Sequence, residues 1–283
     1  YEPIARIDED DGWGSSEELP EFKTHVTVET PRSIITHNES PDIPFDQSIN
    51  PYRGCEHGCI YCFARPTHAF MGLSPGLDFE SRLFAKENAA ALLEKELSAK
   101  NYKPKLVAIG TNTDPYQPIE RQRKIMRGLL EVLSRFNHPV GIVTKSALVT
   151  RDIDILAPMA EKGLAKVYLS VTTLDGTLAR RMEPRASTPM KRLDAVKQLN
   201  AAGIPTGVMV APIIPSLNDH EIEKILEAAK AAKAQEANYI FLRLPLELKD
   251  LFREWLQDNY PGRLNHVLGL VKDAHGGVDY RPR

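Results

Sequence analysis

Residues 55–62 of this 283-residue chain run Cys55-Glu56-His57-Gly58-Cys59-Ile60-Tyr61-Cys62, and they contain all three cysteines of the protein. Three thiolates this close together can hold a metal centre, but they cannot complete one. Iron–sulfur cubes are usually held by four cysteines, one for each iron. With three, one iron stays open to a ligand, as the open position does in a catalytic metal site.

Beyond the cysteines the chain alternates short apolar segments with amphipathic ones, which predicts parallel strands joined by helices. The first strand is expected at Ile49–Arg53 and the first helix at Ala85–Lys100. The later strands should be buried on both faces and are expected at Lys105–Gly110, Val140–Lys145, Ala165–Val171, Pro205–Ala211 and Tyr239–Leu244. The later helices are expected at about 119–136, 151–162, 189–202, 219–236 and 246–258. Six strand–helix units are too few for an eight-fold barrel.

Residue types at three helix ends support these boundaries. Thr188 before Pro189 predicts an N-cap. Asn218 followed by Glu221 predicts a capping box. Gly203 predicts a helix C-terminus.

Composition is that of an ordinary globular protein, with 42% hydrophobic and 26% charged residues. No apolar run approaches the ~20 residues of a membrane span. Clustered cysteines without an export signal predict a reducing cytoplasmic location. The net charge of −2 is uneven, because residues 1–21 carry eight acids and one base. We expect this segment to be an acidic flexible tail.

The C-x3-C-x2-C spacing, with Tyr61 before the last cysteine, resembles the signature of the radical S-adenosylmethionine (SAM) superfamily. The runs Asn50-Pro51-Tyr52-Arg53-Gly54 and Thr113-Asp114-Pro115-Tyr116-Gln117-Pro118 are similar to a bacterial branch near spore photoproduct lyase. The resemblance implies a [4Fe-4S] cluster on Cys55, Cys59 and Cys62 that binds and reductively cleaves SAM, giving a 5′-deoxyadenosyl radical. It also implies an external electron donor of the flavodoxin or ferredoxin type.

The same resemblance implies an α/β fold, a partial (β/α)6 TIM-like barrel with extensions at both ends. We expect the barrel over residues 49–258, an extended N-terminal segment over 22–48 and a C-terminal extension over 259–283. A short helix is expected near 263–274, and the cap formed there could be truncated at Arg283.

Functional groups of such barrels collect at the carboxyl ends of the strands. By resemblance, Tyr61 packs near the SAM adenine and Lys145 reaches the SAM carboxylate. Both residues have structural alternatives, a core tyrosine and a solvated lysine. The other candidates for binding SAM are Thr111, Asp114, Ser170, Thr172, Glu183 and Arg243. Hydroxyls at strand ends also form hydrogen bonds with backbone groups. Asp114 and Glu183 could pair with Arg121 or Arg185 instead of binding SAM. Arg243 should meet a carboxylate, from protein or ligand.

The substrate is not apparent from the sequence, and nucleic acid is one candidate. A basic cluster near the expected mouth could contact phosphate; it comprises Arg180, Arg181, Arg185, Lys191 and Arg192. Spore photoproduct lyase uses a further cysteine as hydrogen donor, and this chain has none outside its motif. Thymine-dimer repair therefore does not carry over.

Two other functions fit the cysteines. In one, they hold structural zinc with His57 or His68 as a fourth ligand. In the other, they hold an iron–sulfur cluster for electron transfer or sensing without radical chemistry.

Overall fold

Six short strands lie side by side and parallel in the computed structural model, which describes residues 11–12, 23–38 and 45–278. A seventh strand, β2, is antiparallel to β3 at one edge, and the order is β10-β9-β8-β7-β6-β3-β2. The strands are β2 (Ile35–His37), β3 (Gln47–Ile49), β6 (Val107–Ile109), β7 (Val140–Thr144), β8 (Ala165–Ser170), β9 (Thr206–Ile213) and β10 (Glu236–Phe241). This mixed α/β sheet confirms the predicted fold class.

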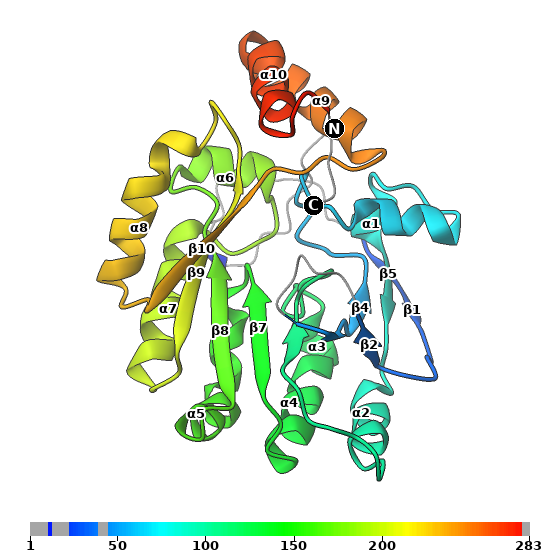
Figure 1. Ribbon diagram of the computed structural model, residues 1–283. Coiled ribbons are helices and arrows are strands. Elements are labelled where there is room, and N and C mark those ends of the chain that lie inside the picture. Colours follow the sequence, from blue (N-terminus) through cyan, green and yellow to red (C-terminus); the bar gives the residue numbers. More distant parts are fainter. Residues whose placement is uncertain (1–10, 13–22, 39–44, 279–283) are drawn as a thin grey trace.

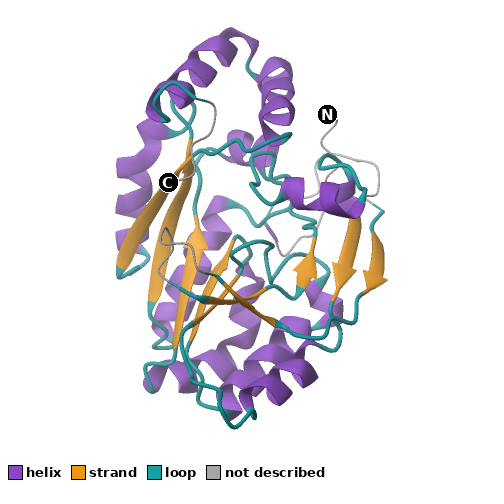
Figure 2. Cartoon of the chain, turned by 45° about the vertical axis from the view of Figure 1, so that its right-hand side comes forward, coloured by secondary structure: helices purple, strands orange, loops and turns teal. Residues whose placement is uncertain are grey.

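Helices follow the strands and pack on the outside of the curved sheet (Figures 1 and 2). The elements from β6 onward are α3 (Glu120–Arg123), α4 (Ile125–Arg135), η3 (Ala147–Asp152), α5 (Ile153–Glu161), α6 (Gly176–Met182), α7 (Pro189–Ala201), η4 (Asp219–Glu221), α8 (Ile222–Ala231), α9 (Leu248–Asn259), η5 (Pro261–Arg263) and α10 (Leu264–Ala274). Earlier come η2 (Arg65–Met71), α1 (Asp78–Ser81) and α2 (Ala89–Leu97).

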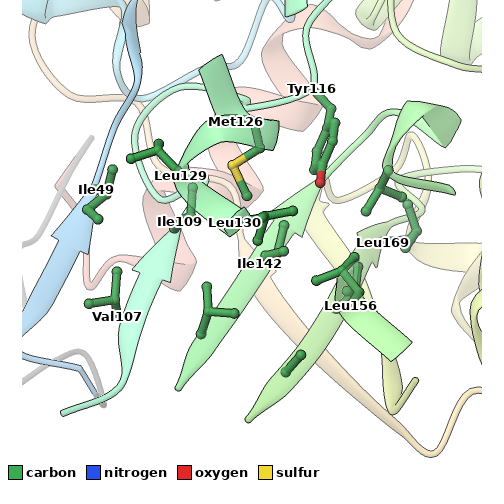
Figure 3. Close-up of a cluster of buried hydrophobic side chains, with 14 of the residues drawn as sticks. Ile49, Val107, Ile109, Tyr116, Met126, Leu129, Leu130, Ile142, Leu156 and Leu169 are labelled. Atoms are coloured by element: carbon green, nitrogen blue, oxygen red, sulfur yellow. The ribbon is translucent and has the colours of Figure 1, made fainter. Parts of the chain in front are cut away.

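The main apolar core fills the space between the sheet and these helices. Ile109 and Ile142 project from β6 and β7 toward Leu129 and Leu130 of α4 (Figure 3). All four side chains have no exposed surface. Removing this much apolar area from water is the main force that holds helix and sheet together.

The predicted first strand, Ile49–Arg53, is wrong as a single element. Pro51 has no backbone N–H to donate and divides it. Residues up to Ile49 form β3 of the main sheet, whereas Tyr52–Arg53 forms β4 of a separate sheet. That second sheet has the order β1-β5-β4, with β1 at His25–Val28 and β5 at Arg82–Ala85.

Two further expectations need correction. The predicted helix over 119–136 is interrupted at Lys124, which adopts a left-handed conformation with φ +52°.

Strand β10 was expected to be buried on both faces, but Tyr239 is 70% exposed and Ile240 is 45% exposed. The helix after β10 crosses toward the end of the sheet instead of covering this strand (Figure 1).

Two of the three predicted helix ends are confirmed. Thr188 caps α7, accepting from the Lys191 amide at 3.3 Å. Gly203 follows α7 with φ +78°. The capping box is wrong, because the Asn218 side chain makes no cap hydrogen bond. Asn218 instead accepts from Ile214 N and donates to Thr172 O, just after β8, and to Pro212 O, near the end of β9.

Helices α9 and α10 lie beyond the carboxyl ends of the strands (Figure 1). Phe252 and Trp255 of α9 and Val267 of α10 belong to a second buried apolar cluster, which also contains Ile60 and Tyr61. The C-terminal segment is therefore packed on the cysteine loop. The predicted helix near 263–274 is confirmed as α10, whereas the predicted acidic tail lies outside the described residues except for Asp11 and Gly12.

None of the helices in the described ranges is both long enough and apolar enough to cross a lipid bilayer.

The core predicts a large stability difference between two leucines on outer helices. Leu129 is fully buried, so Leu129→Ala should lower the free energy of unfolding by about 2–5 kcal/mol. Leu226 of α8 is 40% exposed, and Leu226→Ala should cost less than about 1 kcal/mol. Urea unfolding of both variants, followed by circular dichroism, measures the difference. Equal losses would contradict this description of the core.

Candidate active site

All three cysteines lie on one loop between β4 and η2 that has no regular secondary structure. Gly54 and Gly58 adopt left-handed conformations, with φ +76° and +68°, which other residues rarely accept. Cys55 and Cys59 are 7% exposed, Cys62 is half-buried, and all three are free thiols. Burial raises the pKa of each thiol, that of Cys59 to about 12. A metal bound here must therefore favour the thiolates through its own charge.

The loop lies at the carboxyl ends of the parallel strands. Ile60 and Tyr61 share the second apolar cluster with Ile214, which follows β9, and Leu244, which follows β10. The Ile60 amide also donates to Met182 O at the end of α6, at 3.0 Å. The cysteines therefore face the same end of the barrel as the strand-end polar residues, as in other α/β barrels with functional sites.

Asp114 links the cysteine loop to the ends of β6 and β7. Its carboxylate accepts from Thr144 Oγ1 at 2.6 Å and from Lys145 N at 2.7 Å. His57 Nδ1 lies 3.4 Å from its Oδ2. Burial disfavours the anion, but His57 and these hydrogen bonds hold the pKa of Asp114 at about 2. The carboxylate stays charged and positions the loop. The alternative in which Asp114 pairs with Arg121 or Arg185 is not observed among the described residues.

Glu183 is the centre of a fully buried polar network. It pairs with Arg192, and it accepts hydrogen bonds from Tyr61 Oη and from Thr172 Oγ1 at 2.6 Å. Burial opposes its ionisation, but Arg192 lowers the pKa of the carboxyl below its usual value. Thr172 Oγ1 also lies 3.1 Å from Ala211 O. Because these polar atoms already have protein partners, the network acts as a support beneath the mouth.

Lys145 differs from these residues because its side chain is not committed to an acid. Its Nζ lies 5.6 Å from the centroid of the Tyr61 ring, a cation–π distance. Its charge acts on Cys59, Cys62 and Glu183. In the described part of the chain, Lys145 forms no ion pair, and the residue is half-buried. A half-buried cation beside the cysteines can therefore bind an anionic ligand group.

The structure gives less support to the three remaining predicted residues. Thr111 follows β6 and is half-buried, without a side-chain hydrogen bond to any described residue. Ser170 is buried at the end of β8, and its main-chain oxygen accepts from Arg192 at 3.0 Å. Arg243 lies beyond the end of β10, half-buried, and meets no carboxylate within the described ranges. Their assignment to a ligand stays a prediction.

The sequence missed the buried arginines. Arg185 and Arg192 were placed in a basic cluster that could contact phosphate, but they are 3% and 0% exposed. A signal was present for Arg192, because it lies on the same helical face as Val196 and Leu199, the buried face of α7. Arg65, three residues after Cys62, is also fully buried and had no such signal.

In the described residues, neither His57 nor His68 converges with the cysteines on one metal position. His57 faces Asp114, and His68 Nε2 lies 2.9 Å from Arg82 O. Among the residues that the structure describes, no three His, Cys, Asp or Glu side chains converge to hold a single metal ion. An iron–sulfur cube does not require such convergence, because each thiolate binds a different iron.

Comparisons with known proteins identify the family of the chain. A family model described as the Radical SAM superfamily matches residues 49–229. An uncharacterised protein of Mycobacterium tuberculosis is 37% identical over 232 residues, which are 81% of this chain and 68% of the relative. An uncharacterised protein of Methanocaldococcus jannaschii is 31% identical over 214 residues, 75% of this chain and 76% of the relative.

Solved structures of spore photoproduct lyase share the fold, with a TM-score of 0.62 at 17% identity. The match covers 83% of this chain and 66% of the lyase, so this chain spans slightly less than two thirds of the lyase's length. One lyase structure contains bound AdoMet and the dinucleoside spore photoproduct. SuiB of Streptococcus suis bound to SAM has a TM-score of 0.50 at 18% identity and covers 76% of this chain and 47% of SuiB.

The buried Glu183 network predicts a large loss of stability when its charge is removed. Glu183→Gln leaves Arg192 uncompensated in a site without solvent, which should cost about 3–5 kcal/mol of unfolding free energy. The matched control is Glu94→Gln, whose partner Arg135 lies 3.0 Å away on the surface. That exposed pair should contribute less than about 1 kcal/mol.

Urea unfolding at neutral pH measures both variants. A Glu183→Gln loss no larger than that of Glu94→Gln would show that Glu183 does not support the mouth.

Proposed function

The chain belongs to the radical SAM superfamily and is a radical SAM enzyme, and we propose that its cysteine loop holds a [4Fe-4S] cluster where SAM is reductively cleaved. The observation that carries the proposal is three free thiols on one loop at the carboxyl ends of the strands. One thiolate for each of three irons leaves the fourth iron for SAM. Family membership favours this function over a structural zinc module or an electron-transfer protein.

The chemistry that such a cluster supplies is delivery of one electron to SAM, giving methionine and a 5′-deoxyadenosyl radical that abstracts a hydrogen atom. The electron comes from an external donor of the flavodoxin or ferredoxin type. The chain's own residues bind and orient SAM, and they exclude water through the apolar cover from α9 and α10.

Lys145 is the residue we assign to the SAM carboxylate. It is a half-buried cation with no acidic partner in the described part of the chain, and the Tyr61 ring holds it beside the cysteines. The Tyr61 ring also remains our candidate for contact with adenine. We do not assign Asp114, Thr172 or Glu183 to SAM, because protein groups already occupy their polar atoms. Thr111, Ser170 and Arg243 remain candidates for the ribose and the carboxylate.

Nucleic acid is our candidate substrate class. The support is the shared fold with a lyase whose structure holds a dinucleoside lesion. Of the basic cluster after β8, Arg181 and Lys191 are exposed and available to phosphate, whereas Arg185 and Arg192 are buried.

We predict SAM cleavage after anaerobic reconstitution with iron and sulfide and reduction with dithionite. 5′-Deoxyadenosine, measured by chromatography, should form with the wild type and be absent with Cys62→Ala. Lys145→Ala should raise the KM for SAM roughly 10- to 100-fold, the value of a lost hydrogen bond to a charged group. Lys162→Ala, at the far end of α5, is the control and should leave the KM unchanged.

Three results would contradict the proposal in different ways. A protein that takes up zinc and binds no SAM would be a structural module. A cluster whose electron paramagnetic resonance (EPR) spectrum does not respond to SAM would indicate electron transfer. A KM unaffected by Lys145→Ala would remove only the role of that lysine.

Nucleic-acid binding is tested separately with single-stranded 20-mers of DNA and RNA. Arg181→Ala with Lys191→Ala should weaken binding and reduce the slope of log K against log salt by roughly 1.4, about 0.7 for each lost phosphate contact. Arg135→Ala, at the C-terminus of α4, is the control. An unchanged slope in the double variant would overturn this substrate class at these residues.

A further inference from the structure

Two arginine side chains lie buried against the cysteine loop and donate to its backbone. Arg65 is 0% exposed; its Nε donates to Cys59 O at 2.9 Å and its Nη2 to Gly58 O at 3.1 Å. Arg185 is 3% exposed and donates to Glu56 O from the opposite end of the motif. Both guanidiniums therefore bond directly to the segment that carries the thiols.

The Glu80 carboxylate pairs with both cations. Glu80 of α1 is 1% exposed; its Oε1 pairs with Arg65 Nη2 at 2.5 Å, and its Oε2 pairs with Arg185. Gly58 permits this arrangement, because a Cβ there would collide with the Arg185 guanidinium and the Glu80 carboxylate. The remaining guanidinium nitrogen of Arg65 donates to Pro75 O and Gly76 O, at 3.1 and 2.9 Å.

These partners use five directional bonds of Arg65, so its charge is fixed in position. Buried guanidinium is costly unless it is paired and fully hydrogen-bonded. A backbone brace alone could be built from neutral side chains such as Gln117, which accepts from Glu56 N and donates to Gly54 O. The use of two cations at this loop therefore calls for an electrostatic reason.

The position of Arg65 gives that reason. Its guanidinium donates to Gly58 O and Cys59 O, which lie between Cys55 and Cys62 in the chain, so a positive charge is held against the segment whose thiols would carry the cluster. A fixed cation near a redox centre favours the state with one more electron, and net charge is one of the properties that set cluster potentials.

On the basis of the proposed [4Fe-4S] function, we propose that Glu80 is a positioning residue that fixes Arg65 and Arg185 against the cysteine loop. The positive charge of Arg65 then raises the reduction potential of the cluster. The step concerned adds one electron to the cluster from an external one-electron donor. The consequence is that a donor of given potential reduces a larger fraction of the enzyme.

The test separates charge from hydrogen bonding. Arg65→Lys and Arg65→Gln both lose the guanidinium fork, but only Arg65→Gln loses the charge. Each protein is reconstituted anaerobically, its iron and sulfide are counted, and the potential is measured by EPR-monitored redox titration. Arg82→Gln is the control, because Arg82 is an exposed arginine close to Glu80 in the sequence and pairs with Asp78 at 3.4 Å.

We expect Arg65→Gln to lower the equilibrium constant for one-electron reduction at least tenfold, which is about 59 mV. Arg65→Lys and Arg82→Gln should stay near the wild-type potential. Glu80→Gln should shift the potential in the opposite direction, because it removes the opposing anion while Arg65 keeps its four bonds to the main-chain oxygens of Gly58, Cys59, Pro75 and Gly76.

Equal potentials in Arg65→Gln and Arg65→Lys would overturn the electrostatic role and leave a structural brace. If Arg65→Gln does not retain a cluster, the potential of Glu80→Gln decides the question. A potential equal to or lower than that of the wild type would overturn the inference. A wild-type protein that forms no cluster would instead refute the proposed function.

Discussion

The structure around the cysteines depends on one requirement: the buried amide and carbonyl groups of an irregular loop must all find hydrogen-bond partners. The cysteine loop has neither helix nor strand, so its amide and carbonyl groups need side-chain partners. Gln117, Arg65 and Arg185 provide them. These residues come from three segments far apart in sequence, so the loop acquires its shape only when the strand-end connections have assembled around it.

The same requirement explains why the mouth contains so many paired charges. Three acids there each lie beside a base: Glu80 beside Arg65 and Arg185, Glu183 beside Arg192, and Asp114 beside His57. Such pairs contribute little net stability compared with apolar packing, but they fix geometry. Among the predicted site residues, the cations Lys145 and Arg243 have no acidic partner in the described residues, and Lys145 is the one that lies over the Tyr61 ring of the cysteine loop.

The sequence predicted the parts of the structure that arise from local patterns. The parallel strands after residue 100, the helix begun at Thr188 and the helix ended at Gly203 all follow from short-range periodicity and capping chemistry. The sequence could not show that Asn218 hydrogen-bonds to distant carbonyls instead of capping its own helix. It also could not show that Arg185 is buried. Those outcomes depend on long-range partners, Thr172 and Glu80, which no local pattern identifies.

The apolar cover from α9 and α10 has a consequence for biosynthesis. Ile60 and Tyr61 leave the ribosome about 200 residues before Val267 and Val271, with which they share a buried cluster. At typical rates of about 5–20 residues per second, this delay is roughly 10–40 s. During that interval the cysteine loop lacks its C-terminal cover, and we expect maturation factors to reach the nascent thiols more easily than after release of the completed chain.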